Sequence, residues 1–162
     1  MAERSPRPLL RLAAELRSEL EYIDRTVSDA QPLLLSVPGE RITLYASAAL
    51  LDTFYTRVEK AFRHIAAELG GLPEGHGWQR ALLENMALDI PEVRPAVLSV
   101  PTVKALSRFL SFRHRFRNLY LVELEPAPLA TLVQELAPSW SSARAEIENF
   151  LGFLGRLADE LD

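Results

Sequence analysis

The fold of this chain follows from one stretch, ERITLYASAALLDTFYTRVEKAFRHIAAELGG, residues 40–71. Its apolar side chains recur three and four positions apart, which is the spacing of one face of an α-helix. This stripe consists of Leu51, Tyr55, Val58, Phe62, Ile65 and Leu69. Gly70 and Gly71 follow it, and glycine commonly ends a helix because it readily adopts the left-handed conformation. The sequence therefore predicts a long helix over 40–69, with one face that must be buried against other elements.

Apolar residues at the same spacing, separated by prolines and glycines, predict further helices on both sides of this one. Ser99 is expected to cap the helix that starts near 101, and Pro138 is expected to interrupt the last helix, with Ser139 capping its second part. We expect an ordered connection without regular structure over 89–101, and no segment has the alternation of a strand. The predicted fold is all-α, an antiparallel bundle of four to five helices in a single domain, residues 1–162. Besides 40–69, the predicted helices cover 8–30, 77–88, 101–122 and 128–161.

Composition excludes several classes of function. The chain has 162 residues, of which 48% are hydrophobic and 25% charged, as in ordinary globular proteins. It contains no cysteine, which excludes disulfides and thiolate chemistry, and its net charge of −4 disfavours binding to extended duplexes. No apolar run approaches the ~20 residues that span a bilayer, so we expect a cytoplasmic protein without a membrane contact. Phosphate-loop, dinucleotide and zinc motifs are missing from the sequence, and we expect no cofactor and no metal.

One arginine falls inside an apolar stripe. The segment RFLSFRHRFRNLY, residues 108–120, holds four arginines and a histidine, and on a helical wheel Arg113 lies on the face that should meet the core. Arginine stays charged at any ordinary pH, so a buried guanidinium requires an acidic partner, a bound anion or a wet cavity. Glu59 borders the stripe of the 40–69 helix, and we expect it to pair with Arg113. The face in question comprises Leu106, Phe109, Arg113, Phe116 and Tyr120, with Arg117 at its edge.

The same helix holds groups that suit RNA cleavage. His114 lies three residues before Arg117 and four before Asn118, so the three side chains share one side of the helix. Histidine can exchange protons near neutral pH, and arginine can bind a phosphate and stabilise the charge that develops on it. Attack by a 2′-hydroxyl would then give a cyclic phosphate. The plainer alternatives are a structural ion pair and a solvated basic face.

Four segments occur in one order along the chain: YTRVEKAFRHIA at 55–66, GWQRALLENMA at 77–87, IPEVRPAVLS at 90–99 and FRHRFRNLY at 112–120. Together they resemble the HepT-like branch of the HEPN superfamily, over residues 40–160. Such a resemblance implies an all-helical bundle that forms a homodimer, and a metal-independent endoribonuclease toxin with an R-x(4–6)-H motif at the dimer cleft. It also implies a toxin–antitoxin pair, whose antitoxin is a minimal nucleotidyltransferase that attaches AMP to a tyrosine after the motif.

The usual HepT motif reads R-N-x-x-x-H-x-Y, and the tyrosine aligns it with Arg113 and Tyr120. His114 then stands at the asparagine and Asn118 at the histidine, so these two residue types are exchanged. A second alignment uses Arg108 with His114. In both alignments His114 is the proton carrier. By this resemblance Arg113, His114 and Asn118 belong to the catalytic site, and Tyr120 is the site of modification. With Arg117 and Glu59 from the helical pattern, the expected catalytic residues are Arg113, His114, Arg117, Asn118 and Glu59, and Asn118 is expected to orient the substrate.

Two other functions remain open at this point. Asparagine cannot act as an acid or a base, so the exchange is also compatible with a non-catalytic helical module that binds a nucleotide or a nucleotidyltransferase partner through the basic helix. A structural bundle with a basic surface is the third possibility.

Overall fold

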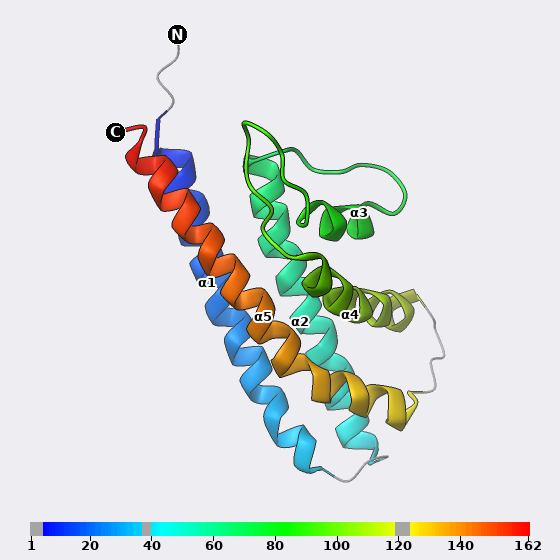
Figure 1. The fold of residues 1–162 in the computed structure, drawn as a ribbon. Helices are drawn as coiled ribbons and strands as arrows, with labels where there is room; N and C mark the ends of the chain where they lie inside the picture. Colours follow the sequence, from blue (N-terminus) through cyan, green and yellow to red (C-terminus); the bar gives the residue numbers. More distant parts are fainter. Residues whose placement is uncertain (1–4, 37–39, 119–123) are drawn as a thin grey trace.

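A computed structural model describes residues 5–36, 40–118 and 124–162 (Figure 1). In these ranges the chain is helical and contains no strand, apart from a single β-bridge between Ile90 and Arg94. The all-α prediction is confirmed. The elements are α1 (Arg7–Ala30), the 3-10 helix η1 (Gln31–Leu35), α2 (Arg41–Glu68), α3 (Trp78–Asn85), α4 (Val100–Asn118) and α5 (Pro126–Asp159).

The three longest helices, α1, α2 and α5, form the body of the bundle, with α1 antiparallel to the other two (Figure 1). The shorter α4 crosses α2, and α3 packs against both α2 and α4. The stripe predicted for α2 lies in the interior, since Leu51, Tyr55, Val58, Phe62 and Ile65 are each at most 1% exposed. The long helix therefore contacts every other α-helix, as its apolar face requires.

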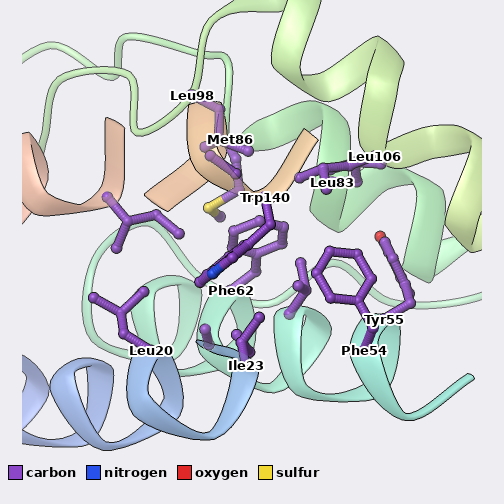
Figure 2. Packing of buried hydrophobic residues seen from close by; sticks show 14 of the residues in the cluster. Leu20, Ile23, Phe54, Tyr55, Phe62, Leu83, Met86, Leu98, Leu106 and Trp140 are labelled. Carbon is purple, nitrogen blue, oxygen red and sulfur yellow. The ribbon is translucent and has the colours of Figure 1, made fainter. Parts of the chain in front are cut away.

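Trp140 of α5 lies in the centre of the core (Figure 2). The ring of Phe54 from α2 packs edge-on against it, with centroids 6.0 Å apart, and packs likewise on Phe109 of α4 at 5.2 Å. The indole Nε1 of Trp140 donates a 2.7 Å hydrogen bond to Asp24 of α1, which satisfies its polar atom. Side chains around this centre include Leu20 and Ile23 of α1, Phe62 of α2, Leu83 of α3 and Leu106 of α4.

The predicted interruption at Pro138 is wrong, because α5 is continuous through this residue. Proline removes one backbone hydrogen bond of a helix. Here Pro138 is exposed, and so is Gln134, whose carbonyl loses its usual donor and is left near water. Leu136 and Trp140, on either side of the proline, are at most 3% exposed. Burial of these flanking residues keeps both halves of the helix in line, so Ser139 caps nothing.

A buried arginine organises the connection between α3 and α4. Arg94 is 4% exposed, and burial lowers its pKa. Its guanidinium donates to the carbonyls of Leu69, Asn85, Leu88 and Pro95, which lie at the ends of α2 and α3 and in the connection. As predicted, the connection lacks regular structure, and α3 ends at Asn85 rather than at 88.

Hydrogen bonds of Ser99 hold the start of α4 in place. Ser99 Oγ accepts the backbone N–H of Thr102 at 3.4 Å, which confirms the predicted cap, and it donates to Glu146 of α5 at 2.6 Å. Together with Arg94, this cap sets the direction in which α4 crosses α2. The last part of the helix predicted over 101–122 lies beyond Asn118, outside the described residues.

Candidate active site

Arg113 of α4 and Glu59 of α2 form the predicted ion pair. Arg113 Nη1 lies 2.8 Å from Glu59 Oε2, and the two side chains are 12% and 7% exposed. The guanidinium also lies near the ring of Tyr55, 5.9 Å from its centroid. The crossing of α4 over α2 thus buries an arginine in the apolar face and gives it a carboxylate.

Asp52 is a second carboxylate beside the arginines of α4, and it was not predicted from the sequence. It lies seven residues before Glu59, two turns earlier on the same face of α2. Its two oxygens bind Arg117 at 2.7 Å to Nε and 2.9 Å to Nη2, and this hydrogen bonding raises the pKa of Arg117. Asp52 Oδ1 is also 4.0 Å from Nε of Arg113, a buried atom without a hydrogen-bond partner among the described residues. The spacing of seven residues between Asp52 and Glu59 is the feature of the sequence that could have identified Asp52.

His114 and Asn118 contact each other on the adjacent face of α4. Asn118 Nδ2 donates to the carbonyl of His114 at 2.9 Å and lies 3.1 Å from Nδ1 of the His114 ring. An amide nitrogen donates and does not accept, so Nδ1 is the acceptor in this contact. The neutral ring then carries its hydrogen on Nε2. His114 therefore presents an N–H donor to anything that approaches its free edge.

The arginines and this histidine line one groove of about 760 Å³. One wall is α4 and the other is the segment 75–80, which leads into α3. The side chains that line the groove include six basic ones and no carboxylate among the described residues. These six are His76, Arg80, Arg113, His114, Arg115 and Arg117.

A second hollow, of about 480 Å³, is also lined by Arg113 and Arg117, and its charged lining residues include Asp52 and Glu59 as well as Arg57, Lys60 and Arg63. The two arginines therefore line both hollows, whereas their carboxylate partners line only the second. Such an arrangement holds guanidinium groups in place while one side remains accessible to an anion.

The segment 75–80 approaches α4 closely. Gly75 and Gly77 have φ values of +83° and +76°, a region that favours glycine, and they shape the turn. Arg80 Nη2 donates to Ser111 Oγ of α4 at 3.4 Å, and Arg63 of α2 lies 5.4 Å from the ring centre of Trp78. Nothing in the sequence pattern predicted that His76, Trp78 and Arg80 share a groove with His114, because this depends on the tertiary position of the turn.

Arg108, the arginine of the second motif alignment, pairs with Glu135 of α5, and its side chain is half exposed. Arg108 therefore lies on the side of α4 that faces α5, whereas Arg113 lines the groove with His114. The geometry favours the alignment through Arg113. Tyr120 lies outside the described residues.

In the described part of the chain, no group of three or more histidine, aspartate or glutamate side chains has the arrangement of a metal site. Nor does any helix in these ranges combine the length and apolarity needed to cross a membrane.

The five α-helices of the described residues form an all-α bundle of the HEPN-like kind. A sequence model of HepT-like proteins matches residues 46–154, a segment that contains most of α2, all of α3 and α4, and most of α5. The chain belongs to the HepT-like family of the HEPN superfamily. Searches of curated proteins and of solved structures found no match.

Proposed function

We propose that this protein is a metal-independent endoribonuclease and the toxin of a toxin–antitoxin pair. The observation that carries the proposal is the groove in which Arg113, His114 and Arg117 meet and no described carboxylate lines the wall. RNA is a polyanion, and a groove lined with cations attracts it and stabilises extra charge on a reacting phosphate. Membership of the HepT-like family supports the same function.

Each group has a distinct role in this proposal. Arg113 and Arg117 bind the scissile phosphate and stabilise the dianionic phosphorane, because guanidinium groups suit phosphate geometry. Glu59 holds Arg113 at 2.8 Å and so fixes its direction. His114 acts at the phosphate through Nε2, the ring nitrogen that Asn118 leaves free. Asn118 is engaged with His114, so its role is to orient this ring rather than the substrate.

The partner in this proposal is a minimal nucleotidyltransferase antitoxin, and the active species is a homodimer with two motif helices at one cleft. AMP on Tyr120, two residues after Asn118 in the sequence, would add bulk and negative charge and repel RNA. Mass spectrometry of the protein co-expressed with such a partner is expected to find AMP on Tyr120; AMP only on another residue would reject this assignment.

Expression in a bacterial host tests the proposal. Wild type is expected to arrest growth and to accelerate RNA decay, and His114→Ala is expected to abolish both effects. His64→Ala is the matched control, because His64 belongs to α2 and contacts Glu15 of α1, away from the groove. Arrest that persists in the His114 variant would remove His114 from the mechanism.

One observation favours a second function, a non-catalytic module. Both arginines already have carboxylate partners, Glu59 and Asp52, which compensate part of their charge. A protein that binds its nucleotidyltransferase partner tightly, but is as harmless as its His114→Ala variant, would support that function instead.

A further inference from the structure

The cleavage reaction needs a group that accepts the proton of the attacking 2′-hydroxyl, and the contact with Asn118 makes His114 unsuited to this step. Because the amide of Asn118 faces Nδ1, the neutral His114 ring has its hydrogen on Nε2. A nitrogen that carries a hydrogen donates and cannot accept a second one. A second side chain in the groove is therefore the better candidate for the base.

The chain offers few candidates for a base. Histidine is the side chain that exchanges protons most readily near neutral pH, and the chain has three histidines. His64 contacts Glu15 on the face between α1 and α2. The carboxylates Asp52 and Glu59 bind Arg117 and Arg113, and they line the second hollow and not the groove. His76 alone of the remaining histidines lines the groove together with His114.

We propose that His76 is a catalytic residue, the general base that takes the 2′-hydroxyl proton; this inference rests on the proposed ribonuclease function. His76 is exposed, and it belongs to the wall of the groove that faces α4. Arg80, four residues later, is hydrogen-bonded to Ser111 of α4. This contact joins the start of α3, two residues after His76, to the helix that carries His114, and both imidazoles line the groove.

The step balances without a further reactant. The 2′-hydroxyl proton moves to His76, the bond from the 2′-oxygen to phosphorus forms, and the bond from phosphorus to the 5′-oxygen breaks. His114 Nε2–H donates a hydrogen bond to the departing 5′-oxygen, which takes a proton from water. The hydroxide so formed takes the proton from His76. The products are a 2′,3′-cyclic phosphate and a 5′-hydroxyl.

The charged groups that share the groove with His76 are Arg80 of its own wall and Arg113, Arg115 and Arg117 of α4, together with His114. Glu74 is the nearest acid in the sequence. Arginine keeps its charge throughout the range in which histidine titrates. A general base works in its neutral form, so single-turnover cleavage is expected to rise with pH between about 5 and 8.

The test uses the full-length protein with total bacterial RNA, followed by a synthetic RNA that contains the site cut by wild type. His76→Asn is expected to lower the single-turnover rate about 10²–10⁴-fold and to remove the rise with pH. Free imidazole is expected to restore part of the rate of His76→Gly, because His76 is exposed and a small base can reach its place. His64→Asn, with wild-type cleavage, is the control, and all variants should melt like wild type.

The outcomes separate this inference from the proposed function. Cleavage by His76→Asn at close to the wild-type rate, while His114→Ala is inactive, would overturn the role of His76 and leave the ribonuclease proposal intact. A slow His76→Asn that keeps the wild-type pH dependence and a His76→Gly without imidazole rescue would also overturn it, since they indicate binding alone. Wild type that cuts no RNA would reject both proposals.

Discussion

Arg117 of α4 is bound by both carboxylate oxygens of Asp52 of α2, at 2.7 and 2.9 Å. The Glu59–Arg113 pair lies about two turns away on α2 and about one turn away on α4, so two ion pairs lie side by side at the crossing of the two helices. The pairs differ in burial, since the side chain of Arg113 is 12% exposed and that of Arg117 is 49% exposed. We expect the buried Glu59–Arg113 pair to contribute to stability and the more exposed Asp52–Arg117 pair to affect RNA binding.

Glu59→Gln is expected to destabilise the fold by about 3 kcal/mol, because it leaves the buried guanidinium of Arg113 without its charge partner. Urea denaturation followed by circular dichroism measures this change in the free energy of unfolding. Glu135→Gln is the matched control: it breaks the exposed pair with Arg108, and surface pairs contribute about 0–1 kcal/mol. Equal effects of the two substitutions would contradict a special role for the buried pair.

Asp52→Asn is expected to tighten RNA binding and to make the affinity more dependent on salt. Arg117 loses the carboxylate that compensates its charge, and each additional phosphate contact of a single strand changes the slope of log affinity against log salt by about −0.7. Fluorescence anisotropy with a mixed-sequence single-stranded RNA measures both quantities.

Asp24→Asn controls for net charge in that experiment, because it makes the same change beside Arg144, at the contact of α1 with α5. Identical shifts for the two variants would show that total charge, and not the freed Arg117, changes the affinity.

Pro138→Ala is expected to stabilise the protein by about 1–3 kcal/mol. Alanine restores the backbone N–H inside the continuous helix α5 and has the higher helix propensity. Thermal denaturation measures the change. Ser139→Ala, which removes a hydroxyl that caps nothing, should melt close to wild type; a large loss there would mean that the helix is broken at this point after all.

Tyr55→Phe is expected to remove part of the loss of stability at alkaline pH. Burial, and then the charge of Glu59, raise the pKa of Tyr55 well above its ordinary value of 10.0. The unfolded chain therefore releases the phenol proton first, so this stabilisation is complete below pH 10 and decreases as pH rises further. Between pH 9 and 11, wild type should lose about 1.4 kcal/mol more than Tyr55→Phe in urea titrations. Parallel losses in the two proteins would show that Tyr55 ionises normally.

The sequence determined those parts of the site that follow from burial along a single helix. Arg113 lies within the apolar face of α4, so its guanidinium requires an acidic partner. Glu59 borders the apolar stripe of α2 and could therefore be predicted as this partner. Asp52 could have been found in the same way, since seven residues separate it from Glu59. Such inferences succeed because a buried guanidinium cannot lose its charge.

Other parts depended on tertiary structure. The continuity of α5 through Pro138 follows from the burial of Leu136 and Trp140 on either side, and local propensity argued against it. The groove exists because Arg94 ties the ends of α2 and α3 to the connection, which places His76 opposite α4. A helical wheel has no information about such a turn.

The nature of the RNA ends tests the central claim most directly. Purified protein is incubated with total RNA in an excess of a metal chelator, and the new termini are identified chemically. The proposed mechanism predicts 2′,3′-cyclic phosphates and 5′-hydroxyls from wild type and no new termini from a folded His114→Ala variant. Intact RNA, or 3′-hydroxyl and 5′-phosphate ends that form only with a divalent metal, would contradict it.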